Sequence, residues 1–328
     1  MISRYSGKNL TGPQKMDPDT EEKLRALGYI GSVAQSTPES RKIDPKDKIH
    51  LAQTIHFAFA EAQKKNHEAA LRMIRPVLEE DPSMTDAHFV AGVSYLGLKQ
   101  YDKALDELLK TLALRPDQTM VFFNLGHTYE AMENLKEAES WYLKVIEQEP
   151  DHLYTNLKLG HLYRRLNQPE KASVHFSRAI QSYEEFLEQS KGDQTRSELL
   201  ATIGEIEFAA GNLEEAEKKF TAAAELTPDQ SMLHYNLAQI YETKGDFPGA
   251  ITEYQKEIRI DPKNFKAFND LGLLYRKAGR FEDAALCFQK VVELAPEDPR
   301  GYLLLSMVYK NMGRNQEADQ IMQRAPRR

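Results

Sequence analysis

Apolar and small side chains recur along this chain with a period of 34 residues, eight times between Leu51 and the C-terminus. In each copy, columns 4, 7, 8 and 11 follow the i, i+3, i+4, i+7 spacing of one helix face. Columns 20, 24 and 27 do the same for a second helix. The pattern therefore predicts eight helix pairs, in copies that begin at Leu51, Thr85, Thr119, Leu153, Ser197, Ser231, Phe265 and Pro299.

Two columns hold small residues in every copy. We predict that the residue at column 8 faces the alanine at column 20, which lets the two helix axes approach closely. Large side chains at column 24, mostly aromatic, are expected to fill the space between neighbouring repeats. Column 20 is Ala70, Ala104, Ala138, Ala172, Ala216, Ala250, Ala284 and Ala318, and column 8 is Ala58, Gly92, Gly126, Gly160, Gly204, Ala238, Gly272 and Ser306.

Turn residues mark the ends of these helices. Proline stands at column 32 in six copies, where it cannot continue the second helix. In the last four copies a glycine follows the first helix, as a left-handed C-cap requires. Ten extra residues, 187–196, separate the fourth copy from the fifth, and we expect the preceding helix to continue through Leu187 and stop near Gly192. Two residues depart from the pattern: Glu257 in the apolar column 27, and Glu61 where column 11 favours tyrosine.

The order L-G-x2-Y, A-x3-F and P at this period resembles the tetratricopeptide repeat family. The resemblance covers residues 51–328 and implies an all-α fold, a right-handed α-solenoid of eight helix–turn–helix repeats with a concave groove. Since each repeat contacts only its neighbours, the array counts as one domain despite its length. We therefore predict two parts: an N-terminal extension, 1–50, with one short helix and a linker, and the solenoid, 51–328.

Residues 17–31 of the extension have a second resemblance. Asp17 and Pro18 begin a helix signal, and an apolar cluster follows at Leu24, Leu27, Tyr29 and Ile30. The segment is similar to the one that closes the catalytic domain of bacterial sulfatase-family proteins, some of which carry a tetratricopeptide tail. The alternative is an ordinary docking helix before a repeat array. No catalytic residue is carried over, because the only cysteine, Cys287, does not match that family's C-x-P/A-x-R motif.

Composition narrows the classes of partner. A net charge of −7 argues against a general nucleic-acid binder and gives no reason to expect an anionic membrane. No stretch approaches the roughly 18 apolar residues of a membrane span. The first residues lack the apolar core of a signal peptide. We expect a cytoplasmic protein from the chain as given, or an exported one if it is a fragment of a larger sulfatase-like protein.

The tetratricopeptide resemblance implies that columns 2, 5, 6, 9, 12 and 13 of the first helices line the groove. Its first zone is apolar, and such patches mark interaction sites when they are exposed. We expect a segment of the chain to cover it, for example the cluster at Leu24 to Ile30; the alternative is that tighter curvature buries it. The zone consists of Ile55, Phe59, Phe89, Val90, Val93 and Leu96, with Phe123 adjoining.

Two further zones are polar. In the second, arginines can hold a carboxylate or phosphate and an asparagine can bond a peptide backbone; the alternative is an ordinary solvated face. The third has mixed charges and predicts no sign of ligand. The second zone is Asn124, His127, Tyr154, Lys158, His161, Arg164 and Arg165, and the third is Asn236, Gln239, Glu242, Lys266, Asn269, Asp270, Arg276 and Lys277.

Catalytic signatures are absent from the sequence. There is no phosphate-binding glycine loop, H-E-x-x-H or nucleophile elbow. His127 and His161 occupy equivalent columns but lack a third ligand, so we predict neither a metal nor a cofactor. The sequence favours a non-catalytic scaffold that binds a protein or peptide. The last repeat has no capping helix, so the face of Leu303, Leu304 and Met307 is expected to support self-association.

Overall fold

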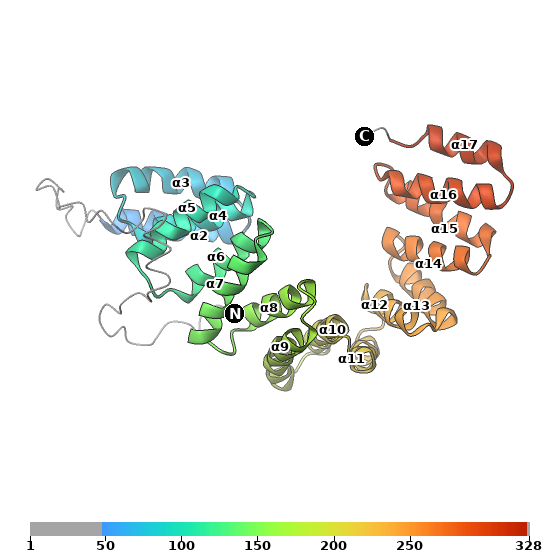
Figure 1. Ribbon diagram of the computed structural model, residues 1–328, viewed down its shortest axis with the longest axis horizontal. Helices are drawn as coiled ribbons and strands as arrows, with labels where there is room; N and C mark the ends of the chain where they lie inside the picture. The colour runs from blue at the N-terminus through green and yellow to red at the C-terminus, as the bar shows by residue number, and fades with distance from the viewer. Residues whose placement is uncertain (1–47, 327–328) are drawn as a thin grey trace, which may run out of the picture. The chain divides into compact units, whose positions relative to one another are not determined.

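The computed structural model describes residues 48–326, in which the backbone forms sixteen α-helices and no strand (Figure 1). The predicted N-terminal helix and the segment with the sulfatase resemblance lie outside these residues. The helices are α2 (Lys48–Gln63), α3 (His67–Glu80), α4 (Thr85–Gly97), α5 (Tyr101–Leu114), α6 (Thr119–Ala131), α7 (Leu135–Gln148), α8 (Leu153–Arg165), α9 (Pro169–Gln189), α10 (Asp193–Ala210), α11 (Leu213–Leu226), α12 (Leu233–Lys244), α13 (Phe247–Ile260), α14 (Phe265–Lys277), α15 (Phe281–Leu294), α16 (Pro299–Asn311) and α17 (Asn315–Gln323).

Each predicted copy forms one helix pair, so the all-α solenoid of eight repeats is confirmed. Even-numbered helices are the first helices of the repeats and odd-numbered helices the second. The chain divides into two compact units, a first unit that ends at Leu162 and a second unit that begins at Tyr163, within α8. Each unit has its own buried core, and each is described below by itself.

The small columns form the centre of every repeat, and column 8 has a close partner that the sequence did not predict. All residues of columns 8 and 20 are buried. A Cβ added at Gly126 would lie 2.6 Å from Tyr142 Cδ1, and one added at Gly272 would lie 2.9 Å from Phe288 Cε1. Column 8 is therefore small because the large side chain at column 24 of the same repeat packs against it. The prediction that column 8 faces column 20 missed this closer partner.

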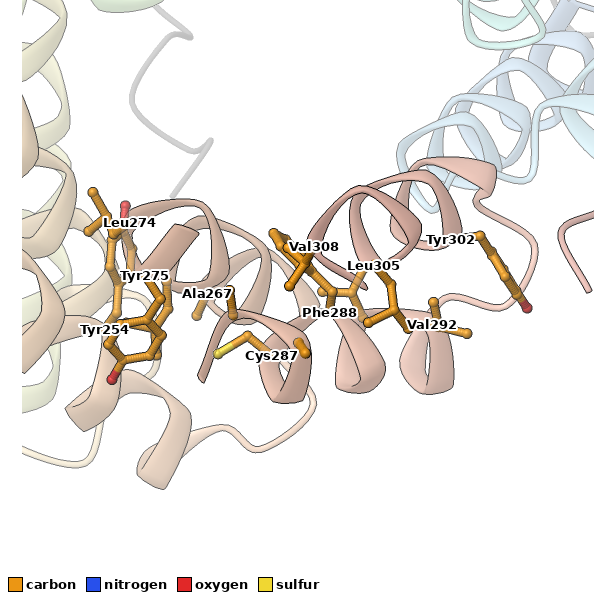
Figure 2. Close-up of a cluster of buried hydrophobic side chains, with 14 of the residues drawn as sticks. Tyr254, Ala267, Leu274, Tyr275, Cys287, Phe288, Val292, Tyr302, Leu305 and Val308 are labelled. Atoms are coloured by element: carbon orange, nitrogen blue, oxygen red, sulfur yellow. The ribbon is translucent and has the colours of Figure 1, made fainter. Parts of the chain in front are cut away.

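The second unit shows how these columns build the core. Phe288 lies fully buried among side chains of α14, α15 and α16, with Leu305 and Val308 beside it (Figure 2). The only cysteine, Cys287, is buried in the same cluster, and burial raises the pKa of its thiol to about 12. These contacts support the expected structural role of this thiol.

The turn after each first helix uses a left-handed residue at column 15 in all eight copies. The four predicted glycines have φ values of 74–90°. In the first four copies Lys65, Lys99, Glu133 and Asn167 take the same conformation, with φ of 56–66°. Glycine marked only half of these turns in the sequence, because the backbone geometry is kept even where the residue is unfavourable.

The helix ends and the insert follow the prediction. Second helices of the six copies with proline at column 32 end two residues before it. In the fourth copy α9 continues to Gln189, and α10 then begins at Asp193, one turn earlier than the first helices of copies two to four. The Arg196 guanidinium donates to the carbonyl oxygens of Leu187 and Ser190, at 3.1 and 3.2 Å, and so closes the turn between the two lengthened helices.

Glutamate replaces tyrosine at column 11 in two copies, and the same contact accompanies both replacements. Asn66 Nδ2 donates to Glu61 Oε2 at 2.8 Å, and Asn212 Nδ2 donates to Glu207 Oε2 at 2.7 Å. Each asparagine lies in the turn five residues later. The Glu61 carboxylate thus finds a hydrogen-bond donor within its own repeat, and its presence does not prevent the first copy from forming a helix pair.

Candidate functional site

The apolar zone of the first unit is not the exposed patch that the sequence predicted. Ile55 and Val90 are buried, and the other five residues are half-buried. The rings of Phe59 and Phe89 pack with their centroids 6.3 Å apart. The expectation of solvent-exposed groups was wrong, because neighbouring repeats pack closely enough to cover these columns. The alternative of burial within the solenoid describes them better.

A different apolar side chain is exposed at the start of the first unit. Phe57, at column 7 of α2, is 60% exposed, and Ile49 on the same helix is also exposed. In the other seven copies the column 7 side chain is at most 5% exposed. Among the described residues no helix precedes α2 to cover this column. We therefore predict that the apolar cluster at Leu24 to Ile30 covers Phe57 and not the first zone.

We predict that deleting residues 1–35 lowers the thermal stability of the first unit and raises its binding of a hydrophobic dye. Covering Phe57 would contribute on the order of 1–2 kcal/mol of hydrophobic free energy. In a double-mutant cycle, Phe57→Ala should destabilise the full chain but add little to the deletion. Additive effects of the two changes, measured by urea unfolding, would show that residues 1–35 do not cover Phe57.

The second predicted zone begins in the first unit. Asn124 is buried, and its Nδ2 donates to the carbonyl oxygen of Met120 in the same helix at 2.7 Å. Tyr154, by contrast, is 63% exposed. Tyr154 is thus exposed to solvent, whereas the amide of Asn124 is directed into its own helix. Binding by either residue stays a prediction.

Charged groups of the second zone near Tyr154 already have partners within the protein. Lys158 Nζ lies 3.0 Å from Glu130 Oε2, which also accepts a hydrogen bond of 2.7 Å from the Tyr142 hydroxyl. Burial and the charge of Lys158 lower the pKa of the half-buried His127. His161 is half-buried as well. Within residues 48–326, no three His, Cys, Asp or Glu side chains gather as metal ligands would.

The remaining residues of this zone belong to the second unit. Arg164 and Arg165 are exposed on the last turn of α8, and Arg164 donates to the carbonyl oxygen of Ala209 at 3.2 Å. That bond directs the Arg164 guanidinium toward the end of α10. Arg165 remains exposed beside it, and anion binding by the two arginines stays a prediction.

A hydrogen-bonded network crosses the third zone. The Tyr235 hydroxyl donates to Asp270 Oδ2 at 2.8 Å and accepts from Gln239 Nε2 at 3.1 Å. Asn269 Nδ2 donates to the other oxygen of Asp270 at 3.0 Å. Burial and the bond to Asp270 raise the pKa of Tyr235. Column spacing could not find the contact between Tyr235 and Asp270, because it joins first helices of two successive repeats.

This network borders a cleft of about 300 Å³ in the second unit. Most of its lining comes from the first helices α14 and α16, and Val291 of α15 and Tyr235 of α12 reach it as well. The cleft has an apolar and a polar part. The apolar part consists of Phe265, Val291, Gly301 and Leu304, and the polar part of Lys266, Asn269, Asp270, Asp298 and Arg300.

Other members of the third zone lie around this network. The Tyr254 hydroxyl donates to Glu242 Oε2 at 3.2 Å. Lys277 Nζ lies over the ring of Phe247, 4.0 Å from its centroid. Arg276 is half-buried. Asn236 hydrogen-bonds Glu205, whose pKa burial raises. Glu242, Lys277 and Asn236 are thus each held by a neighbouring side chain outside the zone.

Comparison with known proteins agrees with this arrangement. Family models described as tetratricopeptide repeat match residues 60–119 and 202–265, 117–185, 265–298 and 299–325. Together they cover about three quarters of the chain, and the insert falls in the gap between two matches.

Solved structures with similar folds include a tetratricopeptide repeat protein from Parabacteroides merdae. It is 18% identical to this chain with a TM-score of 0.59, over 79% of this chain and 98% of that one. A structure of MamA is 20% identical with a TM-score of 0.42, over 48% and 90% of the two chains. Among the described residues, no helix is both long and apolar enough to cross a bilayer.

Proposed function

This chain belongs to the tetratricopeptide repeat family, and from that premise we propose that it is a non-catalytic scaffold that binds a protein or peptide. Binding would use the first-helix surface, by which we mean columns 2, 5, 6, 9, 12 and 13 of the even-numbered helices. The two units each carry one part of this surface.

One observation carries the proposal: apolar side chains are exposed on this surface although the repeats have their own core. Met120 and Tyr154 at column 2, and Leu303 at column 5, are all more than half exposed. In contrast, columns 8 and 20 are buried in every copy and maintain the fold. A scaffold of this kind can change its exposed columns from repeat to repeat without loss of packing, which is what recognition of a particular partner needs.

Site-specific photo-crosslinking tests the proposal. A benzophenone amino acid is placed at Tyr154 and Leu303 on the first-helix surface. The controls carry it at Leu286 and Val174 on second helices, which match the first pair closely in exposure. We expect the same partner to be captured from cell extract by the first-helix positions and not by the controls. Capture from the second-helix positions alone would contradict the proposal.

The alternative is that the chain is the accessory tail of a sulfatase-like hydrolase. It rests on the resemblance of residues 17–31 alone. The protein recovered for crosslinking can also be mapped by mass spectrometry. Peptides of a sulfatase-like domain preceding Met1 would support the alternative, together with its predicted export.

A further inference from the structure

The last two first helices of the second unit present the same order of side chains along one face. A cation stands at column 2, an apolar side chain at column 9 and a second cation at column 12. On α14 these are Lys266, Leu273 and Arg276; on α16 they are Arg300, Met307 and Lys310. Leu303 adds a second apolar side chain to α16, where it and Met307 are 51% and 43% exposed.

The N-terminal parts of α14 and α16 share one surface. Columns 2 and 5 of α14 and columns 2 and 6 of α16 all border the same cleft, through Lys266, Asn269, Arg300 and Leu304. On each helix the two cations are ten residues apart, which corresponds to about 15 Å along the axis. We call this the basic-rimmed surface: two rows of cations, Lys266 with Arg300 and Arg276 with Lys310, on either side of Leu303 and Met307.

Its cations are largely available to a ligand. Among the described residues, Lys266, Arg276 and Lys310 have no ion-pair partner. Arg300 is the exception, since its guanidinium lies 2.6 Å from Asp298. Asp270, the nearby anion, accepts hydrogen bonds from Tyr235 and Asn269. The surface therefore has a local excess of positive charge in a chain whose net charge is −7.

The other first helices of the second unit lack this pattern. Columns 2 and 12 are Glu198 and Phe208 on α10. In the next repeat they are Met232, just before α12, and Glu242 on α12. None of these four side chains is cationic. The two rows of cations are thus a property of the last two repeats and not of the fold.

We infer that the basic-rimmed surface binds an amphipathic helix of a partner protein, whose apolar stripe is bordered on both sides by aspartate or glutamate. The inference rests on the proposed function and narrows it to one partner chemistry. A helix with its side chains is about 10–12 Å wide, so it fits between cation rows about 15 Å apart when it lies across α14 and α16. Its apolar stripe then covers Leu303 and Met307, and its acidic borders face the two rows.

The apolar centre separates this partner from other anions. A single-stranded nucleic acid would favour aromatic side chains between the cations, because its bases stack on them. Leu303 and Met307 offer no such platform. Their exposure instead matches the aliphatic contacts of a helix laid on a groove.

The experiment uses the full chain and a defined probe, a fluorescein-labelled 18-residue peptide with a leucine stripe bordered by glutamates. One matched peptide has lysine for every glutamate, and another has serine for every leucine. We expect binding of the first peptide only, by fluorescence anisotropy, with an affinity that falls as salt rises.

Substitutions in the chain locate the site. Lys266→Glu, Arg276→Glu and Lys310→Glu together should weaken binding by at least about tenfold. Leu303→Ser with Met307→Ser should do so without a change of charge. The matched control, Arg259→Glu, Lys263→Glu and Arg324→Glu, changes the net charge equally at exposed positions outside the surface and should leave binding unchanged. Circular dichroism checks that every variant is folded.

Three outcomes would overturn the inference. The lysine peptide could bind as tightly as the acidic one, or the control variant could lose binding as much as the triple variant. Alternatively, the chain could sediment as a dimer that Leu303→Ser with Met307→Ser dissociates, which would make a second copy the occupant. If the acidic peptide fails to bind while crosslinking from Tyr154 succeeds, this inference fails and the proposed function stands.

Discussion

Replacing Gly126 with alanine is expected to lower the free energy of unfolding of the first unit by about 1–3 kcal/mol, the usual cost of overpacking. The new methyl group would lie 2.6 and 2.7 Å from Cδ1 and Cε1 of Tyr142. That ring is completely buried, and its hydroxyl is held by Glu130, which is also paired with Lys158. The ring therefore cannot move away without disturbing a hydrogen bond and an ion pair.

Two other glycines provide the controls. A Cβ at Gly204 would lie 3.1 Å from the ring of Phe220, so Gly204→Ala should cost less. At Gly192 the nearest such atom, Thr195 Oγ1, is 4.0 Å away, and Gly192→Ala should be nearly neutral. Repeat arrays depart from two-state unfolding, so urea titration is combined with native-state hydrogen exchange to assign each loss to its own repeat. Equal stability of the three variants would contradict the conclusion that the side chain at column 24 packs against column 8.

Much of the fold could be predicted from the sequence because one period repeats eight times. The spacing of apolar columns predicted every helix pair among the described residues, and the proline column predicted where second helices end. It could not identify the partner of column 8, since spacing gives the face of a helix but not the residue opposite. Nor could it find the left-handed turns at Lys65, Lys99, Glu133 and Asn167, where no glycine marks them.

The candidate site was harder to predict, because exposure depends on neighbouring repeats. Ile55 and Phe57 are two residues apart on α2, yet the first is buried and the second is exposed. Packing against α3 and α4 covers the side of α2 that carries Ile55, and no described helix precedes α2 to cover Phe57. Groups that hold each other in place, such as Tyr235 and Asp270, are 35 residues apart and were invisible to a periodicity argument.

Glu257 shows how a departure from the repeat pattern acquires a structural role. The sequence marked it as a charge in an apolar column, and its side chain is completely buried on α13. Its carboxyl oxygens accept hydrogen bonds from the Met232 N–H at 2.9 and 3.0 Å, the Ser231 hydroxyl at 3.0 Å and Asn264 Nδ2 at 2.9 Å. The carboxyl group thus accepts hydrogen bonds from the two residues just before α12.

This contact accounts for the unusual start of α12. The helix begins at Leu233, column 3, whereas α4, α6 and α14 begin at column 1. Met232 precedes it with a φ of 77°, a left-handed conformation that costs a residue with a Cβ roughly 1 kcal/mol. Such strain persists only where surrounding contacts hold it. Here the two bonds from Met232 to Glu257 supply that restraint.

We therefore expect Glu257→Leu to destabilise the second unit by about 3 kcal/mol. Leucine suits column 27 and would gain about 1.5–3 kcal/mol from burial. Against that gain, the buried Asn264 amide and the part-buried donors of Ser231 and Met232 lose their acceptor, and a buried donor left unsatisfied costs about 1–3 kcal/mol. The loss exceeds the gain unless the residues before α12 rearrange. Glu257→Gln, which keeps one acceptor oxygen, should fall between leucine and the native residue.

Urea unfolding measures the loss, and hydrogen exchange of the Met232 amide locates it. Glu225→Leu, at an exposed position on α11, is the matched control and should change neither. Met232→Gly tests the strain separately and should stabilise the native chain slightly, because glycine adopts this φ without cost. If Glu257→Leu were as stable as the native protein, the residues before α12 would have found other acceptors. The left-handed start of α12 would then be a consequence of the carboxyl group and not a requirement of the fold.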